Sequence, residues 1–396
     1  MGPMRHVTDA ERRARLAARH ALTPASRVDS PEAATRAMTV LHATEPATVY
    51  LSCWARVADF EIADLDRALY DERRLVKQLA MRRTLFVFPR DLLPAVWPSA
   101  SARVATLERA RMAKEIVKAG AADDGEEWLD KARGEVLALL ADAPEGRTAV
   151  EVREAVPMIN VKAPMSASET FSSSSVLLYL GLVGDIVRGA NTARWSTSRP
   201  RWTLMRHWLG DVPASWQAAD GYRELVRHWL FSFGPGTEDD LVWWLGSTKT
   251  VVRAALAELD AVRVSLDGGD FGWLLPDDLA EVPDPGPWVA LLPALDPTVM
   301  GWKGRDFYLG PHRDQLFDNR GNAGTTAWAD GRVVGCWVRD DAGAVEVRLL
   351  EQVPARTRRA LDAEAARLTA WLGGHRVGSG YRSPAMKADV VSAPAG

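Results

Sequence analysis

The tripeptide His42-Ala43-Thr44 carries two side chains whose chemistry suits work on a bound water molecule. A neutral imidazole accepts a hydrogen bond or a proton near pH 7, so His42 can hold and activate water. Thr44 offers a hydroxyl, which is shorter and is not a base. Each residue also has a structural interpretation, with His42 bonded to backbone at a helix end and Thr44 capping the next helix. We interpret Glu45 as a partner of that helix dipole rather than as an acid catalyst.

Residues 30–57 must position this tripeptide, and their pattern predicts two helices joined by a tight connection. Ser30 and Pro31 form a start signal, in which a hydroxyl cap precedes a proline that needs no N–H. The run Thr44-Glu45-Pro46 repeats that signal for the second helix. Apolar residues follow each start at helical spacing. The tripeptide is therefore expected at the junction between the helices.

The composition is typical of a globular protein built from two to four modules. The chain has 396 residues, of which 47% are hydrophobic and 26% charged. No apolar run reaches the roughly 18 to 20 residues that span a bilayer, and residues 1–20 lack the apolar core of a signal peptide. Cys53 and Cys336 are too few for a disulfide framework, which makes the cytoplasm, with its nucleoid, the expected location.

The charge is unevenly distributed along the chain. Residues 1–120 contain 20 Lys and Arg against 14 Asp and Glu, a net charge of +6, whereas residues 121–396 contain 29 against 38, a net charge of −9. A basic first third on an acidic body fits a protein that meets a polyanion with one face. Chance asymmetry in a large protein is the alternative.

Helix and strand signals recur in one order three times, which predicts tandem winged-helix (helix-turn-helix) units. The fold class expected is α+β, with a small antiparallel β-barrel and a C-terminal helix after the third unit. The expected segments are winged-helix units at 1–120, 121–210 and 211–282, a β-barrel-like domain with its closing helix at 283–375, and a flexible tail at 376–396.

The individual elements follow from apolar spacing and turn residues. The expected helices are 10–21, 62–69, 73–81, 92–119, 126–141, 148–155, 168–182, 222–231, 237–244, 247–259 and 355–372. The expected strands are 82–89, 185–188, 195–204, 262–266, 271–275, 289–292, 298–302, 307–309, 325–328, 332–338 and 345–350.

Basic residues on the expected wings and on a barrel loop are candidates for contact with DNA phosphates. A solvated surface role is the alternative for the arginines and lysines, and a place in the core is the alternative for the tryptophan. Lys249 and Arg253 on the third unit's recognition helix have acidic neighbours, so packing between domains is equally open for them. The DNA-binding candidates are Arg82, Arg83, Arg194, Trp195, Arg201, Lys303 and Arg305, with His312 and Arg313 near the last two.

Five stretches follow one another in an order that one family shares: HATEPATVYLSCWARV, RRTLFVFP, RHWLFSFGPGTEDDLVWWLG, LLPALDPTVMGWKGR and ADGRVVGCWVR. Over about residues 20–375 the chain resembles the bacterial winged-helix DNA-binding proteins that include the AlkZ-like and YcaQ-like DNA glycosylases. The resemblance implies tandem winged helices with a β-barrel, hydrolysis of the N-glycosidic bond of alkylated or crosslinked bases, and no metal or cofactor. It also implies a catalytic motif of Gln, an apolar residue, then Gln or Asp. His42, Ala43 and Thr44 occupy those positions here, and both polar positions differ.

Three functional hypotheses follow from these observations. The first is a monofunctional glycosylase in which His42 and Thr44 are catalytic. The second is a non-enzymatic winged-helix protein that binds DNA, and the third is an interaction scaffold. Double-stranded DNA is the expected partner, and the protein is expected to be a monomer that meets no membrane. No metal or cofactor is expected, because neither nucleotide-binding loops nor paired metal-ligand motifs occur.

Overall fold

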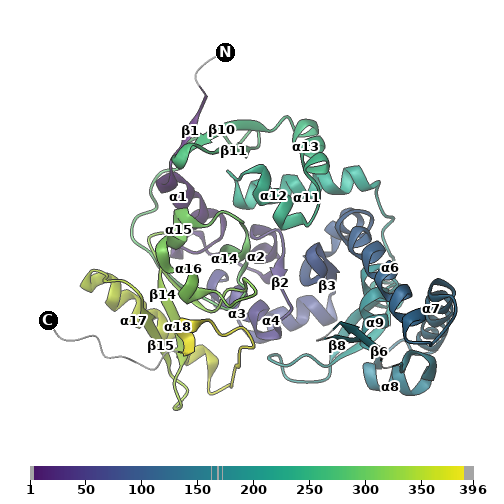
Figure 1. The fold of residues 1–396 in the computed structure, drawn as a ribbon. Coiled ribbons are helices and arrows are strands. Elements are labelled where there is room, and N and C mark those ends of the chain that lie inside the picture. Colours follow the sequence, from purple (N-terminus) through teal and green to yellow (C-terminus); the bar gives the residue numbers. More distant parts are fainter. Residues whose placement is uncertain (1–3, 162, 167–168, 172, 388–396) are drawn as a thin grey trace. The chain divides into compact units, whose positions relative to one another are not determined.

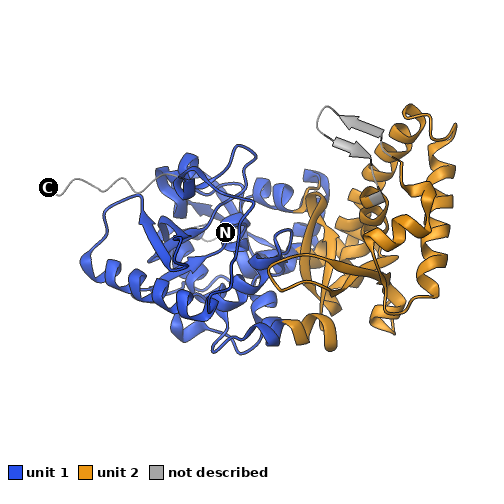
Figure 2. Cartoon of the chain, turned by 90° about the horizontal axis from the view of Figure 1, so that it is seen from below, with its two compact units in different colours: residues 1–65, 226–244, 248–396 blue, residues 66–225, 245–247 orange. Residues whose placement is uncertain are grey.

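The computed structural model describes residues 4–161, 163–166, 169–171 and 173–387. The chain forms two compact units, coloured separately in Figure 2. Unit 1 comprises residues 1–65, 226–244 and 248–396, and unit 2 comprises residues 66–225 and 245–247. The chain passes from one unit to the other at the end of α4 (Ile62–Asp66), within α11 (Ala218–Phe233) and near the end of α12 (Glu238–Leu245), and it returns to unit 1 after residue 247.

Unit 1 is built from helices around two small sheets (Figure 1). Its remaining helices are α1 (Asp9–Arg19), α2 (Pro31–Ala37), α3 (Pro46–Arg56), α13 (Lys249–Glu258), α14 (Pro297–Met300), α15 (Asp306–Leu309), α16 (Arg313–Leu316), α17 (Ala355–Leu372) and α18 (Pro384–Lys387). Short strand β2 (Leu41–His42) lies between α2 and α3.

The C-terminal sheet of unit 1 is an open antiparallel meander of four strands. Its order is β12 (Val289–Leu292), β13 (Thr326–Ala329), β14 (Arg332–Arg339) and β15 (Val345–Leu349). Helix α17 packs against β12 and β15. Within the described residues these strands do not close into the expected β-barrel.

Two of the strands expected for that barrel, at 298–302 and 307–309, are the short helices α14 and α15. The reason is local. The side chain of Asp296 caps α14 by accepting a hydrogen bond from the Thr298 amide, and Pro297 takes the first helical position. The β-branched residues that favoured a strand are therefore helical.

The second sheet of unit 1 joins segments far apart in the sequence. Strand β1 (His6–Val7) pairs in parallel with β10 (Val262–Leu266), which pairs antiparallel with β11 (Phe271–Leu274). The order α11, α12, α13, β10, β11 agrees with the helices and hairpin predicted for residues 222–275.

Near the N-terminus one predicted helix is shorter than its apolar spacing indicates, and another is a strand. Helix α2 ends at Ala37, and Thr39 has a φ of 62°, which stops the helix before Leu41 and His42. Residues 73–81 form strand β3 (Leu75–Ala80), because Arg73 has a φ of 56° and Leu75 pairs with Pro89 on β4 (Thr84–Pro89). Sheet pairing here outweighs the helical spacing of the apolar residues.

Unit 2 holds most of its helices in residues 90–209. They are α5 (Leu93–Val96), α6 (Ala102–Lys118), α7 (Gly125–Ala141), α8 (Ala149–Ala155), α9 (Ser173–Leu182) and α10 (Met205–Leu209), with π-helical turns at Arg67–Asp71 and Trp97–Ser101. Helix α8 begins at the predicted position, because Thr148 and Glu151 form a capping box.

The sheet of unit 2 has the order β5 (Arg147–Thr148), β9 (Pro200–Leu204) and β8 (Ile186–Asn191). Residues 189–191 follow the strand predicted at 185–188, and they lie inside β8. Asn191 closes a loop, because its amide bonds three loop carbonyls and accepts from the Arg199 amide. Strands β6 (Ala163–Ser166) and β7 (Glu169–Phe171) lie within or beside the helix expected at 168–182, where Ser168 and Ser172 are outside the described residues.

Residues 376–387 do not form a loose tail. Ser383, Ala385 and Met386 are buried, and α18 packs against α16 and β14. The side chain of Arg348 donates to the carbonyls of Ala385 and Met386. The tail expected at 376–396 is thus wrong up to Lys387, and residues 388–396 lie outside the described part of the chain.

Candidate functional site

The tripeptide lies between α2 and α3, with its members in different environments. His42 is in β2 and is 8% exposed, and Ala43 is 4% exposed. Thr44 is exposed to solvent. The His42 side chain is therefore enclosed by protein rather than open to solvent.

Thr44 does not cap α3. The N-cap residue is Glu45, and its side chain makes no capping hydrogen bond. Pro46, at the first helical position, supplies no N–H. The Thr44 hydroxyl is therefore not committed to the cap that the sequence assigned to it.

One face of α3 is anchored to the loop that follows β12. The hydroxyl of Thr48 donates to the carbonyl of Ala294 at 2.8 Å, and the hydroxyl of Ser52 donates to Asp296 at 2.7 Å. Arg56 donates to both carboxylate oxygens of Asp296, at 2.7 and 2.9 Å. Since these residues recur every four positions, a single helical face fixes the helix that follows the tripeptide.

The carboxylate of Glu45 holds the C-terminal segment instead of its own helix. One oxygen accepts a hydrogen bond from the hydroxyl of Ser379 and the other accepts from the amide of Gly380, both at 3.0 Å. Burial raises the pKa of Glu45, and the two hydrogen bonds oppose that rise. The sequence assigned Glu45 to the helix dipole and contained no signal for this long-range contact.

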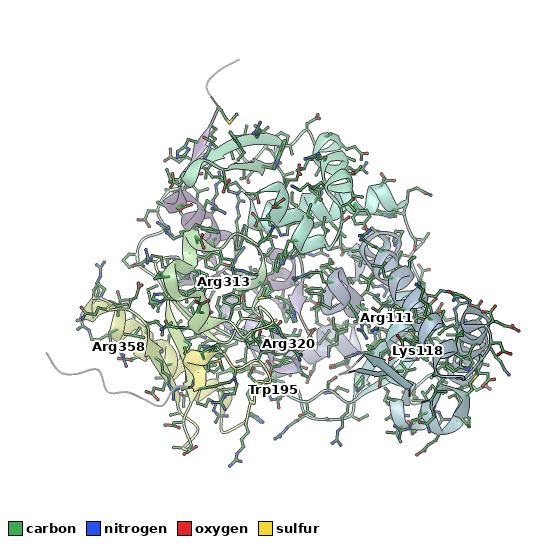
Figure 3. All side chains as sticks on the ribbon, in the orientation of Figure 1. Arg111, Lys118, Trp195, Arg313, Arg320 and Arg358 are labelled. Carbon is green, nitrogen blue, oxygen red and sulfur yellow. The ribbon has the colours of Figure 1, made fainter. Side chains whose placement is uncertain are left out.

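Tyr381 lies near Glu45, and it also lies near the turn at residues 318–322. Burial raises the pKa of Tyr381, the carboxylates of Glu45 and Asp318 raise it further, and the charge of Arg320 lowers it. Asp318 accepts hydrogen bonds from the amides of Arg320 and Asn322 at 2.9 Å, which hold the turn closed. Arg320 is exposed in this turn and is labelled in Figure 3.

Sequence reasoning missed Arg320, although a signal for it exists. The run Asp-Asn-Arg-Gly-Asn at residues 318–322 has the composition of a tight turn, in which an aspartate bonds the amides that follow it. A turn of this kind presents its arginine on a rigid backbone. The structure therefore adds an exposed cation, Arg320, near Tyr381.

A pocket of about 410 Å³ lies in unit 1 beside the start of α3. Its wall is mixed: Leu51, Pro293 and Met386 are apolar, whereas Glu45 and Arg339 are charged. Residues of the C-terminal segment complete the lining.

In unit 2 the candidates Arg82 and Arg83 occupy the turn of the β3–β4 hairpin. Both have left-handed backbone, with φ of 55° and 60°. Arg82 is exposed, and Arg83 forms an ion pair with Glu108 at 3.2 Å. Left-handed backbone disfavours residues with a Cβ, so both arginines are held at this hairpin tip at a local energetic cost.

The candidates of the second hairpin differ from one another. Arg194 is exposed in the loop that Asn191 organises, and Trp195 is buried at 7% exposure. Arg201 donates to the carbonyls of Glu145 and Gly146 and so fixes local backbone. These positions favour Arg194 for a surface contact and structural roles for the other two.

The candidates near the C-terminal sheet have protein partners. Lys303 is exposed and pairs with Asp239 at 3.3 Å, and Lys249 pairs with the same carboxylate at 2.9 Å. Arg305 is 4% exposed and lies beside the rings of Trp243 and Phe317. Burial lowers the pKa of Arg305.

Other basic side chains from the sequence argument are also paired. Arg253 pairs with Glu238 at 2.7 Å, and His312 contacts Glu351 at 2.9 Å. Arg313 is exposed near the Phe317 ring. Among the described residues there is no cluster of three metal-ligating side chains, and none of the described helices combines the length and apolarity needed to cross a bilayer.

Comparison with known proteins identifies the family of this chain. A family model described as DNA glycosylase AlkZ-like matches residues 35–371, which include the tripeptide and most of both units. The chain belongs to the AlkZ-like DNA glycosylase family. Among solved structures, the DNA glycosylase AlkZ of Streptomyces sahachiroi is similar in fold, with a TM-score of 0.72 and 18% sequence identity. That alignment covers 92% of this chain and 97% of the other. No curated protein matches the chain.

This chain gathers several polar side chains at the start of α3. Its polar side chains there are His42, Thr44 and Glu45, with Tyr381 and Arg320 near the last of these. One imidazole, two hydroxyls, a carboxylate and a guanidinium can hold water, stabilise a cation and bind a phosphate.

Proposed function

We propose that this AlkZ-like protein is a monofunctional DNA glycosylase, which hydrolyses the N-glycosidic bond of alkylated or crosslinked bases in duplex DNA. The observation that carries the proposal is the family match across residues 35–371, which spans His42 and Thr44. We also propose that the repeated order of helices followed by a hairpin represents tandem winged helices. The segment boundaries at residues 120, 210 and 282 remain part of this proposal.

This reaction needs little catalytic assistance from the protein. A purine alkylated at a ring nitrogen carries positive charge, so it leaves with the bonding electron pair as a neutral base. The sugar becomes an oxocarbenium cation, and water adds to its C1′. His42 accepts the proton that this water loses, and the Thr44 hydroxyl bonds the water or the sugar. The products are a free base and an abasic site.

Binding to the duplex uses cations in both units. In unit 1 we propose that Arg320 contacts a phosphate, and in unit 2 that Arg82, Arg83 and Arg194 do so. Lys303 pairs with Asp239 and takes a smaller part. Arg201, Trp195 and Arg305 support the backbone and core in which those contacts are held. The protein would act as a monomer on nucleoid DNA in the cytoplasm.

The test is release of base from a duplex that carries N7-alkylated guanine. The wild type is expected to generate abasic sites in a single-turnover assay. His42→Ala is expected to lower the rate about 100-fold or more, as for the loss of a general base, while duplex retardation is unchanged. Thr44→Ala is expected to cost less, about tenfold, because a hydroxyl does not take the proton. Equal rates for wild type and His42→Ala would reject this catalytic assignment.

A second candidate is a non-enzymatic DNA-binding protein of the same fold. The observation that favours it is the 8% exposure of His42, together with a threonine at the other polar position. This candidate predicts salt-dependent retardation of the duplex by a wild type that releases no base. Absence of both retardation and base release would leave the scaffold role.

A further inference from the structure

The C-terminal segment of unit 1 returns to the start of α3 (Figure 1). Residues 377–379 line the pocket beside α3, and Ser379 and Gly380 bond the carboxylate of Glu45. We name this contact of Glu45 with Ser379 and Gly380 the clasp. It joins residues more than 330 positions apart in the sequence.

The clasp has the geometry of a built contact. Each oxygen of Glu45 accepts one hydrogen bond at 3.0 Å. The Ser379 hydroxyl donates to Glu45 and accepts from the Tyr381 amide, also at 3.0 Å. This local turn orients the hydroxyl before it meets the carboxylate. Charge-assisted bonds of this kind are stronger than bonds between neutral groups.

Both partners of the clasp are fixed at their far ends. Helix α3 is held by Thr48, Ser52 and Arg56 through the bonds to Ala294 and Asp296. The C-terminal segment is held by buried Met386, whose carbonyl accepts from Arg348. The clasp therefore links helix α3 to the C-terminal segment, and it does so at the residue that follows Thr44.

We infer that Glu45 is a positioning residue, which sets the place of His42 and Thr44 by holding the start of α3 against the C-terminal segment. The N-cap residue commonly bonds its own helix, whereas here the carboxylate turns away from α3. Thr44 is joined to Glu45 by one peptide bond, so movement of the cap moves the hydroxyl directly. This inference rests on the proposed function for its kinetic consequence.

The chain offers a matched pair of variants at Gly380. A Cβ added there meets no atom within 4 Å, and the residue has no left-handed backbone. Gly380→Pro removes the donating N–H, whereas Gly380→Ala retains it and serves as the control. Ser379→Ala removes the second bond, and Glu45→Ala removes both. Glu45→Gln retains one acceptor oxygen and should recover part of the loss.

Two readouts are needed. The first is the single-turnover rate of abasic-site formation on N7-alkylated duplex, with retardation of the same duplex measured beside it. The second is hydrogen exchange at the Thr48 amide, which bonds the Glu45 carbonyl in the first turn of α3. Hydrogen exchange reports local opening whether or not the protein is an enzyme.

We expect Ser379→Ala and Gly380→Pro each to lower the rate about tenfold, because small misplacement of catalytic groups costs rate steeply. Retardation should not change. The double variant Glu45→Ala/Ser379→Ala should be no slower than Glu45→Ala alone, since both remove the same contact. Exchange at Thr48 should be about tenfold faster in each of these variants and unchanged in Gly380→Ala.

The outcomes separate the clasp from the glycosylase assignment. If wild type releases no base, the proposed function fails and hydrogen exchange alone decides the clasp. Unchanged exchange in Ser379→Ala and Gly380→Pro overturns the clasp in either case. Faster exchange with wild-type rates overturns the positioning role. Circular dichroism detects a global loss of fold in Glu45→Ala. In that case the comparison of Gly380→Pro with Gly380→Ala decides the test.

Discussion

The imidazole of His20 is enclosed in unit 1, where its two nitrogens lie 3.0 Å from the Thr298 hydroxyl and from the Ser232 carbonyl. Burial lowers the pKa of His20 to about 3, and the charge of Arg56 adds to the effect. Burial raises the pKa of Asp296, yet the charge of Arg56 and the hydrogen bonds from Arg56, Ser52 and the Thr298 amide together hold that pKa below the usual value. These residues make the core of unit 1 sensitive to protons.

The first prediction concerns His20 and acid. Unfolded His20 binds a proton below pH 6.5, whereas folded His20 stays neutral down to about pH 3. The unfolded state therefore gains protons first, and the free energy of unfolding falls as pH drops from 6.5. The slope from this group approaches 1.36 kcal/mol per pH unit. Urea unfolding at pH 7, 6, 5 and 4 should show this slope reduced in His20→Gln. Identical slopes in both proteins would contradict the prediction.

The second prediction concerns the ion pair of Arg56 and Asp296, both of which have 0% exposed side chains. Asp296→Ala leaves a buried guanidinium without its carboxylate and should cost about 3–5 kcal/mol of unfolding free energy. Replacing both residues, as Arg56→Met/Asp296→Leu, should cost less than the single change, because no charge is left buried. Urea unfolding measures both. A larger loss in the double variant would argue against this explanation.

At the scale of elements, the turn at residues 318–322 is the feature whose function is easiest to test. Three hydrogen bonds from Asn322 and Arg320 to the Asp318 carboxylate hold it. The same bonds keep the pKa of Asp318 low although burial would raise it. The turn is thus rigid while its arginine stays exposed.

The third prediction is that Arg320→Ala weakens duplex binding equally for all sequences. Removing one phosphate contact should reduce the slope of log affinity against log salt by about 1. Arg358→Ala is the matched control, because Arg358 is exposed in unit 1 but pairs with Asp362 at 2.9 Å on α17 (Figure 3). Retardation assays at several salt concentrations measure both. Equal losses in the two variants would remove Arg320 from the proposed interface.

Elements also show where sequence reasoning succeeds. Caps and turn residues placed α8, α13 and the hairpin β10–β11 well, because each has local signals such as Thr148 or Gly268-Gly269. Strand β3 was misread because apolar spacing in a short run fits both periods, and only pairing with β4 decides. The clasp of Glu45 could not be predicted, since nothing near residue 45 records a partner at residue 379.

At the scale of the whole molecule, a chain of net charge −3 must hold a polyanion with local groups of cations. The fourth prediction is therefore strong salt dependence of duplex binding. If Arg82, Arg83 and Arg320 each meet a phosphate, the slope of log affinity against log salt should be about −2.7 or steeper. Filter binding between low and moderate salt measures it. Affinity that does not change with salt would exclude a phosphate-based interface.

The AlkZ-like match begins at residue 35, but the first 34 residues belong to the fold of unit 1. Strand β1 pairs with β10, and Arg15 and Arg19 both donate to Asp278. A shortened protein that starts at residue 35 would lose the edge strand β1, and Asp278 would lose both of its arginine partners. A protein prepared for assay or crystallisation should therefore retain residues 4–34 and extend through Lys387.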